Sequence, residues 1–186
     1  MILPIVQYGT PVLRQKGKAV PSVDGPVKKL IADMLETMRD AKGVGLAAQQ
    51  VGQALQVAVI DITGVKERES KMWIGGKPVD PEAHMPLVLI NPEISGTKSK
   101  VKGTEGCLSF PGIGAEISRS QRVRVKAKNA DGKIFEFEAA GLLGRAVQHE
   151  YDHLHGRLFI DLMDAATRKE LREEIQLLEA ETKAAL

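Results

Sequence analysis

Two histidines one helical turn apart are the strongest chemical signal in this sequence. His149 and His153 enclose Glu150, Tyr151 and Asp152 in the segment HEYDH. In a helix, residues four positions apart lie on one face, so both imidazoles can reach a single metal ion. The carboxylate of Glu150, next to the first histidine, can act as general base toward water at such a metal. The pattern therefore predicts a hydrolytic metal centre.

Two histidines do not complete a catalytic site, which needs three protein ligands and an open position. In metzincins the third ligand is a later histidine, but Phe159 occupies that position here. Glu173 or Glu174 could be proposed instead, although we expect both on the solvent face of an amphipathic helix. Cys107, the one cysteine, follows Gly106 and precedes a short turn. A thiolate would add charge and softness to the ligand set.

Composition narrows the class of protein. The chain has 186 residues, 43% hydrophobic and 27% charged, as expected for one globular domain. The 26 basic and 24 acidic side chains leave a net charge of +2, so bulk charge does not predict nucleic-acid binding. No apolar run approaches the roughly 18 residues of a membrane span, and the start MILPIVQYG lacks the features of a signal peptide. We expect a cytoplasmic protein.

Helical periodicity is clearest in two segments. Residues 26–41 carry apolar side chains at helical spacing, with Asp24 as a cap and Gly43 placed to end the helix. A second helix is predicted near residues 141–155, followed by Gly156. This second helix carries the two histidines.

A C-terminal helix is predicted over residues 164–184. Asp164 is its expected cap. Its apolar stripe consists of Leu171, Ile175 and Leu178. We expect this stripe to pack on the domain, and no cluster of Lys and Arg there predicts an RNA-binding patch.

Strands dominate the middle of the chain. They are expected at 56–62 and 86–94, in the stretch leading into 105–112, and in a hairpin of RVRVKAKN and KIFEFEA. Residues 43–52 are predicted to form a loop and a tight turn, and residues 63–84 a surface excursion. The elements together predict an α+β fold: mainly antiparallel β-sheets packed around a central metal-binding helix, with an N-terminal helix and a C-terminal helix.

Three segments together resemble the signature motifs of the peptide deformylase family. They are GVGLAAQQ at 43–50, EGCLS at 105–109 and QHEYDH at 148–153, in the family's order and spacing. The resemblance covers the whole chain and implies one catalytic domain over residues 1–186. The implied activity is metal-dependent hydrolysis that removes the formyl group from the N-terminal formyl-methionine of newly made polypeptides, releasing formate.

The resemblance assigns the metal to Cys107, His149 and His153, with water in the fourth position. It implies one divalent ion per chain, Fe(II) in the native enzyme, with Zn(II) or Ni(II) as alternatives in purified protein. Cys/His₂ sites accept several divalent ions, so the sequence does not select among them.

Three further residues occupy catalytic positions of that family. Glu150 matches the general base, which would take a proton from the attacking water and pass it to the leaving amine. The side-chain amide of Gln50 and the backbone N–H of Leu108 would stabilise the negative charge that develops on the carbonyl oxygen. The sequence itself does not show that Gln50 lies near Cys107.

The substrate is expected to bind as a short added strand along Val44, Gly45 and Gly106. Recognition of methionine requires an apolar pocket. By family position its lining would be Val44, Leu142, Arg145 through its aliphatic stem, Ala146 and His149. Periodicity alone fits equally well with Leu142 and Ala146 as ordinary core residues.

Several neighbours of these motifs carry weaker signals. Glu105 and Arg119 resemble a structural ion pair that steadies the cysteine-bearing segment. Asp152 is either a partner for a ligand histidine or a solvated carboxylate. Gly103 and Gly114 stand where many relatives carry larger or charged side chains, which predicts a more open cleft rim.

Two other functions stay open at this point. One is a metallopeptidase with Glu173 as third ligand. The other is a metal-bound structural or partner-binding module, which would be expected to lack Glu150 or Gln50, and both are present. The family resemblance implies nascent N-formyl-methionyl polypeptides as partners, a transient ribosome contact of the C-terminal helix in some bacteria, no membrane, no direct nucleic-acid readout, and a monomer.

Overall fold

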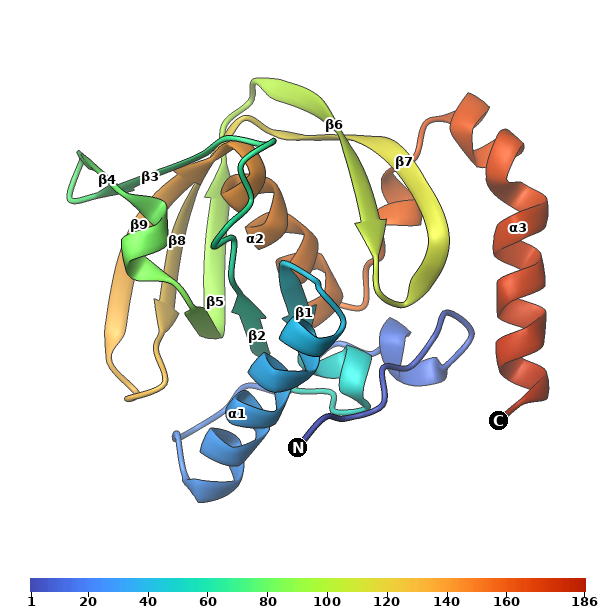
Figure 1. Cartoon of the computed structure of the whole chain (residues 1–186), viewed down its shortest axis with the longest axis horizontal. Helices are drawn as coiled ribbons and strands as arrows, with labels where there is room; N and C mark the ends of the chain where they lie inside the picture. Colours follow the sequence, from blue (N-terminus) through green and yellow to red (C-terminus); the bar gives the residue numbers. More distant parts are fainter.

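The fold contains three α-helices, each close to its predicted position in the sequence (Figure 1). The computed structural model describes residues 1–186. The helices are α1 (Gly25–Asp40), α2 (Gly141–Leu154) and α3 (Ala165–Ala184). The Asp24 carboxylate accepts the N–H of Val27 and the Asp164 carboxylate accepts that of Thr167, so both predicted caps are confirmed. No helix combines the length and apolar character needed to cross a bilayer.

Nine strands form two sheets in which every neighbouring pair is antiparallel. The larger sheet has seven strands in the order β1 (Gly45–Ala47), β2 (Val57–Ile60), β5 (Leu87–Gly96), β8 (Arg122–Lys128), β9 (Ile134–Ala140), β3 (Ser70–Ile74) and β4 (Lys77–Val79). The smaller is the hairpin of β6 (Lys100–Cys107) and β7 (Phe110–Ser120). The predicted α+β class is confirmed.

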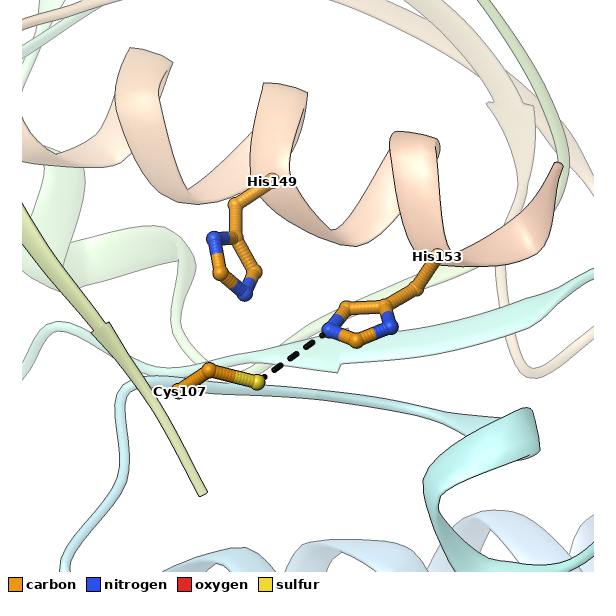
Figure 2. A group of neighbouring side chains, drawn as sticks. All are labelled: Cys107, His149 and His153. Carbon is orange, nitrogen blue, oxygen red and sulfur yellow. Dashed lines mark hydrogen bonds between the residues drawn. The ribbon is translucent and has the colours of Figure 1, made fainter. Parts of the chain in front are cut away.

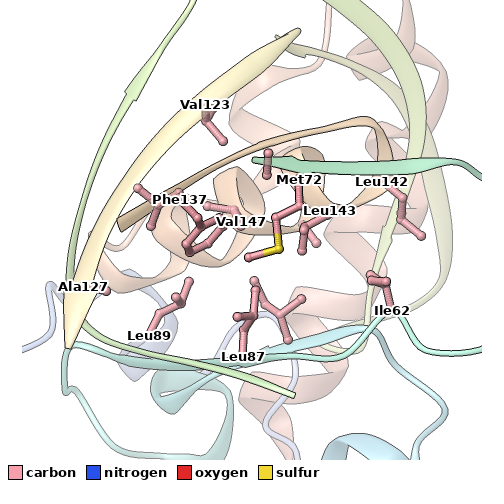
Figure 3. Packing of buried hydrophobic residues seen from close by; sticks show 14 residues of the cluster. Ile62, Met72, Leu87, Leu89, Val123, Ala127, Phe137, Leu142, Leu143 and Val147 are labelled. Carbon is pink, nitrogen blue, oxygen red and sulfur yellow. The ribbon is translucent and has the colours of Figure 1, made fainter. Parts of the chain in front are cut away.

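The large sheet is buried on both faces at β2 and the first half of β5, which explains the continuous apolar runs of these strands, whereas β8 and β9 alternate buried and exposed residues. In β2, Val57 and Val59 pack in the cluster that contains Met34 and Met38 of α1. Ile60 packs in the opposite cluster, which includes residues of α2. Figure 3 shows this second cluster, with Phe137, Met72, Leu143 and Val147 in contact between sheet and helix.

Helix α2 lies between the large sheet and the β6–β7 hairpin (Figure 1). This position brings a face of α2 to the end of β6. On the outer side of the hairpin, α3 packs its stripe of Leu171, Ile175 and Leu178 against a cluster that includes Phe110 and Phe159. The predicted packing of the C-terminal helix is therefore confirmed.

Two segments predicted as irregular contain strands. Residues 43–52 hold β1 and a short 3₁₀ helix, Ala48–Val51, and residues 63–84 hold β3 and β4. The surface-excursion prediction was wrong for β3 because Met72 enters the core and β3 pairs with β9. The neighbouring Trp73 ring stacks under the Arg122 guanidinium at 3.5 Å.

The ends of other elements also differ from prediction. Strand β5 ends at Gly96, two residues beyond the predicted end, and Asn91 within it takes a φ of 51° where the pairing with β8 shifts register. Helix α1 ends at Asp40, and the left-handed residue of the turn that follows is Lys42, with φ 57°, rather than Gly43. Strand β7 was not predicted, because Pro111 and two glycines obscure its alternation of buried and exposed residues.

Candidate active site

Three side chains with metal-binding atoms converge where α2 meets the end of β6. Figure 2 shows the rings of His149 and His153 projecting from α2 toward Cys107. One ligand atom from each residue lies within 4.8 Å of the others. The Cys107 Sγ is 3.4 Å from the His153 Nε2. No other group of three or more His, Cys, Asp or Glu side chains is close enough to hold an ion, and Glu173 is exposed on α3.

The chemistry of these side chains fits a divalent metal ion. The His149 Nδ1–H donates to the Glu105 carboxylate at 2.9 Å, which fixes the tautomer and leaves Nε2 available as a ligand. Burial lowers the pKa of His153 well below its ordinary value, so its imidazole is neutral, as a ligand must be. One sulfur and two nitrogen ligands suit Fe(II) or Zn(II).

Glu105 is the centre of a buried ion cluster behind His149. Its carboxylate accepts two hydrogen bonds from Arg119, at 2.9 and 2.8 Å, and one from Arg145 at 2.8 Å. Burial alone would raise the pKa of Glu105, but hydrogen bonds from Arg119 and His149 outweigh it and hold the pKa well below its usual range. Arg119 also donates to Asp152 at 2.6 Å. Asp152 is therefore the partner of Arg119. It is neither a hydrogen-bond partner of a ligand histidine nor a freely solvated carboxylate, so both alternatives predicted from the sequence were wrong.

Gly103 accommodates Arg145 rather than opening the rim of the cleft. A Cβ added at Gly103 would lie 2.8 Å from the Arg145 guanidinium carbon. That guanidinium also donates to the backbone oxygens of Ile117 and Val101. Gly114, in contrast, does line the cavity beside the site. The open-rim prediction is therefore wrong for Gly103.

Glu150 is buried at the ligand group with one carboxylate oxygen unpartnered. Only 4% of the residue is exposed, and its Oε1 has no hydrogen-bond partner. Burial raises the pKa of Glu150 to about 7. Its other oxygen, Oε2, lies against Gly45, where an added Cβ would be 2.5 Å away. The absence of a side chain at Gly45 therefore makes room for this carboxylate.

Replacing Gly45 by alanine should lower kcat without removing the metal ligands. The new methyl group would displace the Glu150 carboxylate, and a misplacement of about 1 Å can cost on the order of 10²-fold in rate. Steady-state kinetics measure the loss. Gly52→Ala is a poor control because Gly52 has φ 87°, whereas Gly25→Ala has open space and should change kcat less than about twofold. Equal kcat for the Gly45 and Gly25 variants would contradict the close packing.

Gln50 presents its amide nitrogen to the site. Its Oε1 accepts the N–H of Ala47 at 3.0 Å, which leaves Nε2 facing Cys107 Sγ at 3.6 Å and Ser109 Oγ at 3.2 Å. The backbone N–H of Leu108 makes no hydrogen bond within the protein. Two donors thus stand next to the sulfur ligand, as an oxyanion site requires.

A cavity of about 600 Å³ opens above these groups. Five of the site residues line it, whereas His153 does not: Gln50, Cys107, Leu108, His149 and Glu150. Every residue expected to bind substrate also lines it: Val44, Gly45, Gly106, Leu142, Arg145 and Ala146. Leu142 and Ala146 also belong to the core cluster, so the expectation that they are core residues is confirmed, and both face the cavity as well.

Sequence reasoning missed the link from Glu105 to His149 and the hydrogen bond from Gln50 to Ser109. One signal was present for the first. Glu105 and Cys107 are two residues apart in a strand, a spacing that places both side chains on one face. No comparable signal links Ser109 to a glutamine 59 positions away.

Comparison with known proteins gives one family throughout. The polypeptide deformylase family model matches residues 2–169. The peptide deformylase of Methylacidiphilum infernorum is 53% identical over 176 residues, covering 95% of this chain and 92% of that protein. Among solved structures, a Legionella pneumophila peptide deformylase has a TM-score of 0.80 at 36% identity, covering 97% and 96% of the two chains. Arabidopsis thaliana peptide deformylase 1B in complex with an inhibitor has a TM-score of 0.84, also at 36% identity, covering 98% and 93%. This chain therefore belongs to the polypeptide deformylase family.

Proposed function

We propose that this enzyme removes the formyl group from the N-terminal formyl-methionine of newly made polypeptides through the residues described above. The observation that carries the proposal is the unpartnered, buried carboxylate oxygen of Glu150 beside the Cys107, His149 and His153 group. A carboxylate in that environment is suited to proton transfer. Such a carboxylate could take a proton from water and donate it to the nitrogen of an amide.

Cys107, His149 and His153 would hold one divalent metal ion, and we propose Fe(II) as the native one. When bound, such an ion supplies Lewis-acid chemistry and lowers the pKa of water. The Glu105 carboxylate keeps His149 oriented for this role. Arg119 and Arg145 in turn keep Glu105 ionised and fixed.

Glu150 is proposed to move the proton. Its carboxylate takes a proton from the water that attacks the formyl carbon. The C–N bond of the formamide then breaks, and Glu150 delivers the proton to the methionine nitrogen. The products are formic acid and a peptide with a free amine, and transfer of the acid proton to the amine leaves formate and an ammonium terminus, so atoms and charge balance.

Gln50 and Leu108 are proposed to stabilise the developing negative charge on the formyl oxygen. The orientation of the Gln50 amide supports this role, because its oxygen is already occupied by the Ala47 N–H. Both donors are fixed before the reaction begins, and preorganised donors lower the barrier most effectively.

Replacing Gln50 by glutamate should lower kcat by about 10²–10³-fold, because a donor is lost while the acceptor for Ala47 is kept. Steady-state kinetics at a fixed metal content measure the effect. Ser109→Ala is the matched control: it removes the partner of Gln50 at 3.2 Å but no donor to substrate. We expect the control to lose less than about tenfold. A similar loss in both variants would remove Gln50 from the oxyanion site.

The substrate is proposed to lie as an extended strand between β1 and the end of β6. Val44, Gly45 and Gly106 offer backbone groups to it, and Leu142, Ala146 and the stem of Arg145 surround the methionine side chain. We also propose that the enzyme acts in the cytoplasm, where nascent polypeptides are made, and that it acts as a monomer. A ribosome contact by α3 would use the charged face of that helix, since its apolar stripe is packed.

Formate release tests the proposed function. The metal-loaded protein should release formate from an N-formyl-Met tripeptide and leave the N-acetyl analogue and the unblocked peptide intact. Internal cleavage of the unblocked peptide, with no formate from the formyl peptide, would instead identify a metallopeptidase.

A further inference from the structure

Two basic side chains line the same cavity as the catalytic residues and have no acidic partner. Lys42 is exposed and Arg68 is half-buried, and neither side chain makes a hydrogen bond or ion pair within the protein. Arg145, the third basic residue in the lining, is occupied by Glu105. The mechanism proposed above uses neither Lys42 nor Arg68.

Lys42 lies beside the path of an extended substrate. It is three residues before Gly45, which contacts the Glu150 carboxylate at the reacting end of the cavity. At about 3.3 Å per residue, Lys42 is within roughly 10 Å of that end. An extended peptide with its formyl group at Glu150 has its second and third residues within this distance, counting methionine as the first. The Gly43 N–H donates to the Met38 oxygen at 3.0 Å, so the turn that carries Lys42 is fixed to α1.

Arg68 lies on the side of the cavity formed by the start of α2. The backbone oxygen of its neighbour Glu69 accepts the N–H of Leu142 at 2.8 Å. Leu142 is a wall of the proposed methionine pocket. Lys42 and Arg68 therefore approach the substrate from different walls, one beside β1 and one beside α2.

The remaining wall, formed by β6 and β7, carries no free carboxylate. Gly106, Gly112 and Gly114 line part of it, together with the apolar side chains of Phe110, Pro111 and Ile113. The two acidic residues in the lining are Glu105 and Glu150, and both are buried. Glu105 is paired with two arginines, and Glu150 lies at the reacting end. The outer part of the cavity thus has two cations with room for side chains of the opposite charge.

We propose that Lys42 and Arg68 make this enzyme prefer N-formyl-methionyl peptides with acidic side chains at the second and third residues. This inference rests on the proposed function and names its preferred substrates. Exposed ion pairs are weak, each corresponding to about 1.5- to 5-fold in binding. Contacts so far from the reacting carbon act equally on substrate and transition state, so they lower KM and leave kcat unchanged.

Three amidated peptides test the preference: N-formyl-Met-Glu-Glu, N-formyl-Met-Gln-Gln and N-formyl-Met-Lys-Lys. At about 0.01 M salt, where charges interact over roughly 30 Å, kcat/KM for the Glu peptide should exceed that for the Lys peptide by about tenfold. The difference should lie in KM and shrink to less than about twofold near 1 M salt, where the screening length is roughly 3 Å.

Variants assign the preference to the two residues. Combining Lys42→Gln with Arg68→Gln should reduce the Glu-to-Lys ratio below about twofold, and Lys42→Glu should move it in favour of the Lys peptide. Lys66→Gln is the matched control. It removes a nearby charge that pairs with Glu82 and lies outside this cavity, so it should keep the wild-type ratio.

Equal kcat/KM for the three peptides at low salt would overturn the inference, as would a ratio that survives in the double variant. In both cases turnover of the Gln peptide would still uphold the proposed function. If protein with one metal per chain turned over none of the three peptides, the proposed function would fail, and this inference with it.

Discussion

Glu150→Gln should retain one metal ion per chain and lose about 10²–10⁴-fold in kcat, the usual contribution of a general acid–base group. Glutamine matches glutamate in size, so it fits the space beside Gly45. The Oε1 of Glu150 has no protein partner, so the change breaks no hydrogen bond at that atom. The variant therefore removes the proton acceptor and little else.

Metal content and kcat measured on the same preparation separate the two effects. Glu136→Gln makes the same chemical change on the exposed side of β9 and should alter kcat by less than about twofold. Wild-type turnover by metal-loaded Glu150→Gln would show that another group transfers the proton. Loss of metal from that variant would mean that Glu150 contributes to the ligand set.

Cys107→Ser should weaken metal binding by more than about 100-fold, since loss of a partner that only orients a ligand already costs 10–100-fold. Serine keeps the small volume but removes the sulfur atom that lies 3.4 Å from the His153 Nε2. A hydroxyl is a poor replacement, because it stays protonated near neutral pH and supplies neither the charge nor the softness of a thiolate.

Competition with a chelator of known affinity measures the change in the metal dissociation constant. Formate release should fall in parallel and recover in part when metal is added in excess. The exposed Ser99→Ala variant, remote from the ligand group, should bind metal like the wild type. Full metal occupancy and full activity in Cys107→Ser would remove Cys107 from the proposed ligands.

Local sequence patterns predicted the parts of the fold that local physics controls. The apolar runs at Val57–Ile60 and in β5 predicted strands because a sheet covered on both faces needs apolar residues at every position. The hairpin of β8 and β9 followed from alternation, and its register places Lys126 opposite Glu136. Strand β3 could not be predicted, because only burial of Met72 against distant residues makes its five residues a strand.

The candidate site likewise has one part that local sequence patterns predict and another that they do not. The spacing of His149 and His153 is a property of one helix, so the sequence alone predicted that they share a face. The meeting of Gln50 with Cys107 joins residues 57 positions apart, and that of Cys107 with His153 joins residues 46 apart. Helical spacing carries no information at such separations; the resemblance to a known family supplied it.

One contact of Arg145 was predicted neither by local sequence patterns nor by the family resemblance. Its place in the cavity lining was expected, but its guanidinium also binds Glu105. That contact requires a glycine at position 103, since a Cβ there would collide with it. The pairing of Gly103 with Arg145 is a property of two residues 42 positions apart and becomes visible only when β6 lies against α2.

Stepwise addition of Fe(II) to the metal-free protein without oxygen, with formate release from an N-formyl-Met tripeptide measured at each step, tests the central claim most directly. Activity should rise in proportion to bound metal and stop rising at one ion per chain, with far less formate released from the Cys107→Ser variant at the same additions. Formate release that is independent of metal, or that requires a second ion, would contradict a single centre at Cys107, His149 and His153.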